Sequence, residues 1–553
     1  MRTLLLLVCS TIFLSAVQAD CKGKSPPKWS QYYTVKGMLF IPYAELREPF
    51  YAWYDEIGKQ SRIDYYGDMV QTYQLPNVTP YGTSIKIAPV TNEEQTNVKT
   101  CLQVNGTENS QVEAQIMLPI LDDFECEGEE IVNGVQTEKW LLQQTIGQKV
   151  NKYTMWVSYK SNPNQDKPVP VPKKYEMKGY NTLLGSHYDH YYIVYTDFTD
   201  DVIPAATFQI DPSYTCTSFP GPGDKHIYTF NPMKEFVYPQ TESHVDFEFG
   251  KFKHKHGKNY ENETEHALRK DIFRQNIRFI HSVNRQGRGY SLGVNHLADK
   301  TELELKALRG KQYTKVEDNG GKPFPYNTLR SAKLPDVFDW RIYGAVAPVK
   351  DQSVCGSCWS FGTVGAIEGA YFLKNGGKLV EFSQQALMDC SWGYGNNGCD
   401  GGEDFRAYAW MLKHGGIPTA DAYGPYLGQD GYCHADKVPK LAKITGFVNV
   451  PANDENALKL AIFKNGPVSV AIDASQKTFS YYSHGVYYEP KCGNKEENLD
   501  HAVLAVGYGT IGNSSYWLIK NSWSNYWGND GYILMSSKDN NCGVMTQATY
   551  VTM

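Results

Sequence analysis

The cysteines fall into two groups, and this grouping limits how the chain can fold. Of the twelve, Cys9 lies in an apolar leader, which leaves four in the first half of the chain and seven in the last part. If each group forms disulfides internally, two separately cross-linked regions are expected and one thiol of the last group stays free. Four cysteines allow three connectivities, and the sequence does not choose among them. The two groups are Cys21, Cys101, Cys126 and Cys216, and then Cys355, Cys358, Cys390, Cys399, Cys433, Cys492 and Cys542.

Residues 1–19 have the pattern of a secretory signal peptide. Arg2 precedes a mostly apolar run, and small residues stand before the expected cleavage after Ala19. No stretch reaches the roughly 20 apolar residues that a membrane span needs. We therefore expect passage through the secretory pathway to a lysosome, a secretory granule or the extracellular space, without a membrane span. Four N-glycosylation sequons fit this route and begin at Asn77, Asn105, Asn262 and Asn513.

The length and charge of the chain narrow its organisation. A single hydrophobic core stops growing at roughly 250 to 300 residues, so 553 residues imply several domains. The net charge of -6 gives no electrostatic reason to bind nucleic acid. Residues 20–242 are rich in tyrosine, with short β-branched and aromatic runs between turn-forming clusters, which predicts a mainly antiparallel sheet. Within it, the proline-rich segment 168–172 is expected to be a surface loop or a polyproline stretch.

Residues 243–333 are charged and predicted to be helical. Six residues recur at steps of three and four, which places them on one face of a long helix. They are Glu265, Arg269, Phe273, Asn276, Ile280 and Asn284. This set matches the ERFNIN motif of papain-type propeptides, and the segment from Gly293 to Asp299 resembles the element that follows it, with Leu297 where the family usually has phenylalanine. The resemblance implies a helical domain whose extended tail lies in the active-site cleft, against the substrate direction, and inhibits the enzyme.

The last part, 334–553, opens with a stretch that carries chemistry. Cys355-Gly356-Ser357-Cys358-Trp359 is followed far downstream by His501 and Asn521. A cysteine attacks as a thiolate, and a free thiol titrates near about 8.5, so it needs a neighbouring positive charge. A histidine supplies that charge and later protonates the leaving amine. A helix that begins at Cys358 would favour the thiolate further.

This pattern is the signature of papain-type cysteine proteases, and the chain beyond about residue 243 resembles papain and cathepsin L. The resemblance implies a helical lobe that carries the nucleophile Cys358 and a β-barrel lobe that carries the base His501. It also implies that Asn521 orients His501 under the cover of Trp523, and that Gln352 donates to the oxyanion. The disulfides that it implies leave Cys358 free. They are Cys355–Cys399, Cys390–Cys433 and Cys492–Cys542.

Substrate contacts are expected on both walls of the cleft. Gly401 and Gly402 resemble the strand-like wall that lets an extended peptide approach. The S2 pocket, which receives the second residue before the cut, would be lined by Glu403, Asp404, Ala471, Leu499 and Gln547. These residues are more polar than those of most cathepsin L-like enzymes. Either a carboxylate there favours a basic or polar substrate residue, or both carboxylates turn to solvent.

The sequence thus predicts an α+β protein: a β-rich N-terminal domain (20–242), an inhibitory propeptide (243–333) and a papain-like two-lobe peptidase (334–553). The predicted function is a thiol endopeptidase made as a self-inhibited zymogen, with protein or peptide substrates, no cofactor and no metal. The layout resembles that of insect two-chain haemocyte cathepsins, so the N-terminal region is a candidate for a chain retained after processing. The rival hypothesis is a ligand-binding or delivery protein that works through its N-terminal domain.

Overall fold

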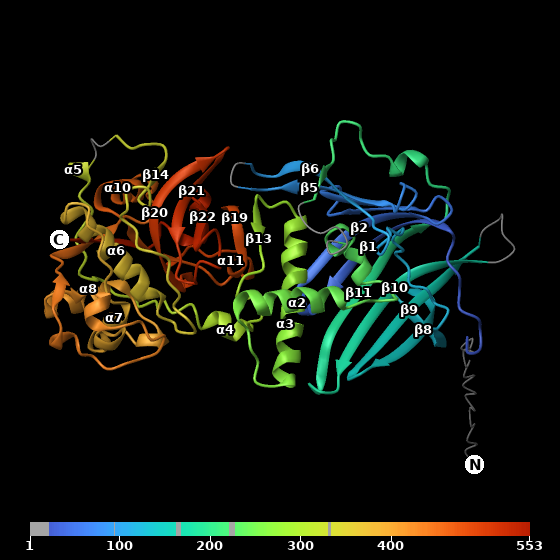
Figure 1. Cartoon of the computed structure of the whole chain (residues 1–553), viewed down its shortest axis with the longest axis horizontal. Coiled ribbons are helices and arrows are strands. Elements are labelled where there is room, and N and C mark those ends of the chain that lie inside the picture. Colours follow the sequence, from blue (N-terminus) through green and yellow to red (C-terminus); the bar gives the residue numbers. More distant parts are fainter. Residues whose placement is uncertain (1–20, 93–94, 162–167, 220–226, 330–332) are drawn as a thin grey trace, which may run out of the picture.

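Three bodies follow one another along the long axis of the molecule, with the central helices between two β-rich parts (Figure 1). The computed structural model describes residues 21–553 apart from 93–94, 162–167, 220–226 and 330–332. The predicted signal peptide lies outside the described residues. Within them, no helix has the length and apolar character that crossing a membrane requires.

The N-terminal body is one twelve-stranded sheet in the order β12-β6-β5-β4-β3-β2-β1-β11-β10-β9-β8-β7. All neighbours are antiparallel except the short β12, which runs parallel to β6, so the expected antiparallel sheet is confirmed. Alternate residues of β1, including Tyr33, Val35 and Leu39, face a buried core that Met117 and Phe236 also join. The strands are β1 (Tyr32–Ile41), β2 (Leu46–Asp55), β3 (Gln60–Tyr65), β4 (Val70–Leu75), β5 (Thr83–Val90), β6 (Val98–Asn105), β7 (Glu125–Val132), β8 (Val135–Ile146), β9 (Lys149–Lys160), β10 (Val169–Asn181), β11 (Ser186–Thr199) and β12 (Thr217–Ser218).

Two details of this sheet go beyond the sequence. Its disulfides are Cys21–Cys126 and Cys101–Cys216, which selects one of the three possible connectivities. The expectation of a loop at 168–172 is wrong, because Pro170 and Pro172 belong to β10 and pair with β9. On the other side β10 pairs with β11 only from Lys174 onward. The prolines therefore lie where the strand has a single neighbour, and a missing N–H is tolerated there.

The central body is helical. Its main elements are α2 (Ser243–His256), α3 (Glu263–Arg285), β13 (Tyr290–Leu292) and α4 (Glu302–Lys306). Helix α3 starts after Asn262, whose side chain accepts a hydrogen bond from the Glu265 amide at 2.9 Å. On the predicted face Phe273 and Ile280 are buried, and the Asn276 side chain donates to the Ala298 carbonyl. This face fixes the following segment, which leads to the tail.

The C-terminal body has a helical lobe and a β lobe (Figure 1). Eight strands of the β lobe follow the order β13-β19-β22-β21-β20-β18-β23-β17, and β14 pairs with β20. Strand β13 comes from the central body, so that body extends the sheet of the β lobe. The main elements are α6 (Cys358–Lys374), α7 (Gln384–Cys390), α8 (Asp404–His414) and α10 (Glu455–Asn465), with β14 (Phe338–Asp339), β17 (Gly446–Val450), β18 (Val468–Ile472), β19 (Tyr482–Tyr487), β20 (His501–Ile511), β21 (Ser514–Lys520), β22 (Tyr532–Ser536) and β23 (Ala548–Thr552).

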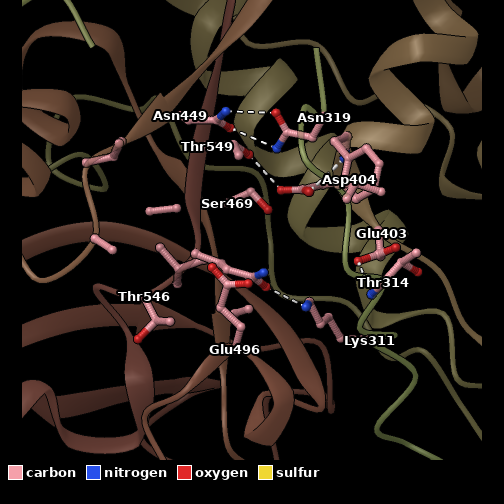
Figure 2. A pocket seen from close by; sticks show the side chains of 18 of the residues that line it. Lys311, Thr314, Asn319, Glu403, Asp404, Asn449, Ser469, Glu496, Thr546 and Thr549 are labelled. Atoms are coloured by element: carbon pink, nitrogen blue, oxygen red, sulfur yellow. Dashed lines mark hydrogen bonds between the residues drawn. The ribbon is translucent and has the colours of Figure 1, made fainter. Parts of the chain in front are cut away.

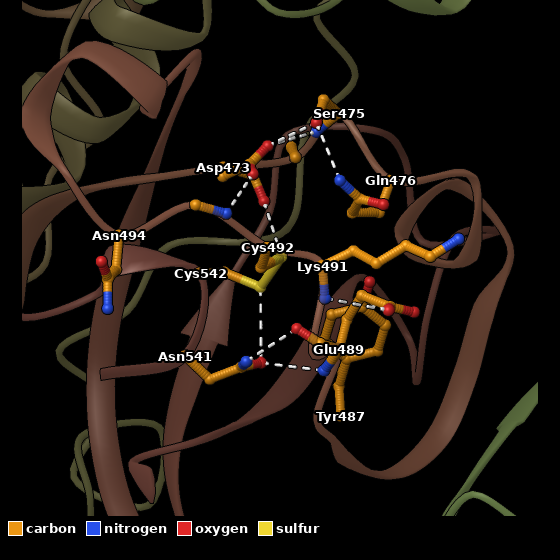
Figure 3. Close-up of a disulfide and its surroundings, with 12 residues drawn as sticks. Asp473, Ser475, Gln476, Tyr487, Glu489, Lys491, Cys492, Asn494, Asn541 and Cys542 are labelled. Carbon is orange, nitrogen blue, oxygen red and sulfur yellow. Dashed lines mark hydrogen bonds between the residues drawn. A yellow bond between two sulfur atoms is a disulfide. The ribbon is translucent and has the colours of Figure 1, made fainter. Parts of the chain in front are cut away.

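The three disulfides of this body are Cys355–Cys399, Cys390–Cys433 and Cys492–Cys542, the pairs that the resemblance implies. Figure 3 shows the last of them, where the Asn541 side chain bonds the Glu489 backbone in both directions, at 2.9 and 3.0 Å. Asp473 accepts from the Gly493 amide at 2.6 Å on the other side of the bridge. This network holds the loops beyond β19 and β22 together beside the cleft.

Candidate active site

Cys358 is the first residue of α6, where the helix N-terminus faces the cleft between the lobes. It is fully buried and is the only free cysteine among the described residues. The amide of Ala502, next to His501, points at the Cys358 sulfur at 3.5 Å. The start of β20 in one lobe therefore lies directly against the start of α6 in the other.

His501 and Asn521 form the second part of the site. The His501 Nε2 atom lies 2.8 Å from the Asn521 Oδ1 atom, and Trp523 stacks beside the imidazole with 4.8 Å between ring centroids. Trp523 is 1% exposed, so it keeps water away from this hydrogen bond. The Nδ1 atom of His501 has no hydrogen-bond partner among the described residues. One ring nitrogen is thus fixed by Asn521 while the other remains available.

Gln352 places a side-chain amide in the same cleft. Its Oε1 atom accepts a hydrogen bond from the Ser522 hydroxyl at 2.7 Å, which orients the amide. Its Nε2 atom donates to the Cys355 carbonyl at 2.7 Å and to the Leu308 carbonyl at 2.8 Å. Leu308 belongs to the central body, so a carbonyl of the tail occupies a donor of this site.

The tail continues across Cys358 in an extended form. The Gly402 amide donates to the Gly310 carbonyl at 2.9 Å, and the Gln312 amide donates to the Gly402 carbonyl at 3.0 Å. Lys311, between them, pairs with Gly402 in a parallel sense. The tail therefore binds the cleft wall with strand-like hydrogen bonds while its direction follows that of the wall. The Lys311 amide adds a hydrogen bond to the Asp500 carbonyl at 3.0 Å on the opposite side.

Under this cover burial disfavours the charged forms of both the thiol and the imidazole. Burial raises the pKa of the Cys358 thiol to about 11, and the amides near the sulfur offset this only in part. Burial lowers the pKa of His501 to about 4, against the effect of Asn521. The charged pair expected from the sequence is therefore less favoured while the tail covers the site, because excluding water penalises both charges.

Four of the five residues expected around S2 line a cavity of about 440 Å³ (Figure 2), which also includes Ala502, whose amide contacts the Cys358 sulfur. Glu403, Asp404, Ala471 and Gln547 line it, whereas Leu499 is buried and lies against Gly543. Glu403 is 3% exposed and pairs with Arg406 at 2.9 Å, so the alternative in which both carboxylates turn to solvent is wrong. The predicted cleft glycines lie under the tail, where a Cβ on Gly401 would approach the Gly310 carbonyl to 2.5 Å.

Some residues of the site were not expected from the sequence. Lys311 of the tail enters the cavity, and Glu496, Ser469 and Thr549 line it. The charged run around Glu496 lies a few residues before His501, and this proximity is the one feature that points to the site. The four predicted sequons, Asn77, Asn105, Asn262 and Asn513, are all exposed.

Comparisons with known proteins agree with this geometry. Residues 334–552 match the family described as "Papain family cysteine protease". Residues 249–305 match the family described as "Cathepsin propeptide inhibitor domain (I29)". The cathepsin L-like peptidase of Aedes aegypti is 45% identical over 325 residues, which cover 55% of this chain and 93% of that protein. Cathepsin L of Sarcophaga peregrina is 45% identical over 317 residues, covering 55% of this chain and 92% of that protein.

Two solved structures that resemble this chain are also procathepsins of the L type. Digestive procathepsin L2 proteinase from the Tenebrio molitor larval midgut aligns with a TM-score of 0.52 and 36% identity, over 56% of this chain and all (100%) of that chain. Digestive procathepsin L 3 from the same source aligns with a TM-score of 0.51 and 36% identity, over 56% and 99%. The likeness thus includes propeptide and peptidase together, and the predicted α+β fold class is confirmed.

Proposed function

The chain belongs to the papain family of cysteine proteases, and from this premise we propose that Cys358, His501, Asn521 and Gln352 carry out its peptide hydrolysis. The chain is a thiol endopeptidase held as a self-inhibited zymogen by its cathepsin-type propeptide. In our proposal the peptidase spans 334–553, the propeptide 243–333 and the N-terminal domain 20–242. One observation carries the assignment. The Gln352 Nε2 atom, the proposed oxyanion donor, already binds a peptide carbonyl, that of Leu308 in the tail, at 2.8 Å, and Cys358 is a free thiol.

The proposed reaction begins when the tail leaves and water enters the cleft. His501 then takes the proton of the Cys358 thiol, and the thiolate attacks the substrate carbonyl carbon. The negative charge on the carbonyl oxygen is stabilised by the Gln352 side chain and the Cys358 amide. The imidazolium protonates the leaving amine, which gives an acyl-enzyme. Water, deprotonated by His501, then attacks the thioester and releases the acid and the thiol.

Asn521 acts as a positioning residue in this scheme. Its Oδ1 atom holds one nitrogen of His501 at 2.8 Å, so the ring keeps the other nitrogen toward the thiol. Gly401 and Gly402 would bind the substrate backbone that replaces the tail, while Trp523 shields the His501 pair. The buried face of the N-terminal sheet is filled by its own side chains, which argues against the rival ligand-binding function.

Covalent labelling tests the assignment. After acid activation of the full chain, an epoxide inhibitor of cysteine proteases should modify Cys358, and peptide hydrolysis should stop in proportion. Cys358→Ser should abolish labelling, and His501→Ala should lower turnover by about a hundredfold or more because the general base is lost. His414→Gln, an exposed histidine at the end of α8, serves as control and should change neither. An active protein that is labelled elsewhere, or that works without Cys358, would contradict the proposal.

We also infer a route and a fate for the chain. The leader at 1–19 and the exposed sequons support entry into the secretory pathway, with a lysosome, a secretory granule or the extracellular space as destination. The N-terminal region has its own core and both of its disulfides are internal. This supports its persistence as a separate chain after processing, as in the two-chain layout. The substrates are proteins or peptides.

A further inference from the structure

Several residues of the tail line the S2 cavity, and the one whose side chain bonds Gln547, Lys311, is basic. Two backbone hydrogen bonds bracket Lys311, because the Gly402 amide donates to the Gly310 carbonyl and the Gln312 amide donates to the Gly402 carbonyl. Figure 2 shows the Lys311 side chain reaching into the cavity. Lys311 thus occupies the place of the second substrate residue before the cut, although the tail runs in the opposite direction.

The part of the cavity around the Lys311 ammonium is polar. Its Nζ atom donates to the Gln547 Oε1 atom in a short hydrogen bond. Burial lowers the pKa of Lys311, and the nearby carboxylates of Glu403, Asp404 and Glu496 oppose this effect. Such opposition means that the cavity favours a cation at this place relative to an apolar pocket of the same size.

The three carboxylates are not equally free to bind a substrate. Glu403 pairs with Arg406 at 2.9 Å, and Asp404 accepts from the Thr549 hydroxyl at 2.6 Å. Among the described residues, no cation lies within ion-pairing distance of the Glu496 carboxylate. When Lys311 leaves, Arg406 is the remaining cation among these groups, so the cavity keeps an excess of negative charge. Gln547 also loses its partner.

The remaining walls leave room for a long side chain. Ala471, Ala502 and Ala548 contribute small side chains to the lining. A large apolar side chain would fill this space but would leave Gln547 without a partner, which costs binding energy. A lysine or arginine side chain combines an apolar stem with a charged end and suits both parts.

We propose that this S2 pocket selects lysine or arginine at the second residue before the cut, with Gln547 and Glu496 as the groups that recognise the charge, and that Lys311 imitates such a residue in the zymogen. This inference rests on the proposed function of Cys358. It predicts cleavage at bonds where the second residue before the cut is lysine or arginine. The preferred substrates are therefore proteins or peptides rich in basic residues.

The test compares fluorogenic dipeptide substrates that differ only in this position, arginine, lysine, leucine or phenylalanine, with arginine next to the cut. We expect the activated enzyme to hydrolyse the arginine substrate with a kcat/KM at least about tenfold above that of the leucine substrate. Glu496→Gln and Gln547→Leu should each lower the arginine-to-leucine ratio by about tenfold. Glu497→Gln, the neighbouring carboxylate outside the cavity lining, should leave the ratio unchanged.

Titration with the epoxide inhibitor distinguishes failure of the proposed function from failure of the S2 assignment. An enzyme that is not labelled at Cys358 overturns the proposed function. An enzyme that is fully labelled but prefers leucine or phenylalanine overturns the S2 assignment alone. A preference for arginine that neither Glu496→Gln nor Gln547→Leu reduces would also overturn the named residues. Lys311→Leu in the full-length zymogen adds an independent readout, since it should speed labelling of Cys358 before any cleavage.

Discussion

At the scale of single residues, the tail passes its narrowest point at Gly310. A Cβ atom there would lie 1.7 Å from the Gly356 carbonyl oxygen, a backbone atom that has no freedom to turn away. Gly310→Ala should therefore lift the tail, weakening its hydrogen bonds to Gln352 and Gly402. We expect the uncleaved precursor to react with the epoxide inhibitor about tenfold faster or more, since a shift of about 1.4 kcal/mol suffices for a factor of ten.

Gly250 provides the matched control, because it lies on α2 of the same body and a Cβ there would meet open space. Gly250→Ala should leave the labelling rate of the precursor unchanged. Equal protection of Cys358 in the Gly310→Ala precursor would mean that the tail is not held at this point.

The residues differ in how far sequence alone could identify them. Cys358, His501, Asn521 and Gln352 each stand in a short local pattern, so their roles could be predicted without knowing the path of the chain. Lys311 could not be assigned, because its role depends on the register of an extended tail against Gly402. That register is set by the docking of α3 and α4, which the sequence of the tail does not specify. Leu499 was expected in S2 because it lies two residues before His501, but its side chain packs against Gly543 instead. Its position in the motif did not determine the direction of its side chain.

At the scale of elements, helix α3 has a second buried face that carries arginines. Arg278 bonds Asp189 of β11 at 2.7 and 2.9 Å and Glu235 at 2.7 Å, and Asp189 is 0% exposed. Arg285 bonds Glu48 of β2 at 2.7 Å. These pairs join the propeptide helix to the N-terminal sheet, so the sheet and the helix form one packed unit.

Removing Arg278 should therefore destabilise that unit. Arg278→Met leaves Asp189 and Glu235 buried without their main partner, which typically costs about 3 to 5 kcal/mol. Thermal unfolding of the Cys358→Ser precursor should show a lower midpoint, and adding Asp189→Asn should recover part of the loss. Lys251→Met, at an exposed pair on α2, is the control and should change stability by less than about 0.5 kcal/mol. A midpoint for Arg278→Met equal to that of the control would show that the buried pair is not needed.

The periodicity of α3 predicted only one of its two faces. The ERFNIN positions repeat in register, whereas Arg274, Arg278 and Arg285 resemble an ordinary solvated surface in the sequence. Their partners lie in strands and loops tens to hundreds of positions away, and nothing local connects them. The prolines of β10 were misassigned for a related reason, because tolerance of proline depends on which neighbour the strand lacks.

At the scale of the whole molecule, the propeptide lies between two bodies whose contacts with it respond differently to acid. Toward the peptidase, His256 and His296 surround Tyr526, with 4.8 and 6.2 Å between ring centroids. Burial, with help from Lys258, lowers the pKa of both histidines to about 4. The docked form holds them neutral, so its stability is fully present above about pH 6.5 and declines as the pH falls toward 4.

Toward the N-terminal sheet, the contacts depend on carboxylates that respond to acid only at a lower pH. Burial favours the protonated form of Asp189 and Glu242, but the arginines of α3 outweigh it. They hold the pKa of Asp189 below its usual range and, with Lys149, lower that of Glu242 to about 2. A depressed carboxylate pKa contributes stability above its unfolded value, 3.8 for Asp189 and 4.5 for Glu242, and this stability is lost only as the pH falls toward the folded value. Between about pH 4.5 and 6.5, acid therefore weakens the contacts of His256 and His296 and spares those of Asp189 and Glu242.

Once the tail is cut, the peptidase should leave as one piece and the N-terminal domain should keep the propeptide helix. Apart from the main chain, no disulfide joins the two parts among the described residues. Size exclusion of the processed protein at pH 5, with mass mapping of termini, should find α3 with the N-terminal sheet. Replacing His256 and His296 by phenylalanine should move separation to lower pH, whereas His254→Ala, exposed on α2, should not. An N-terminal domain that elutes with the peptidase while α3 elutes alone would refute this order of events.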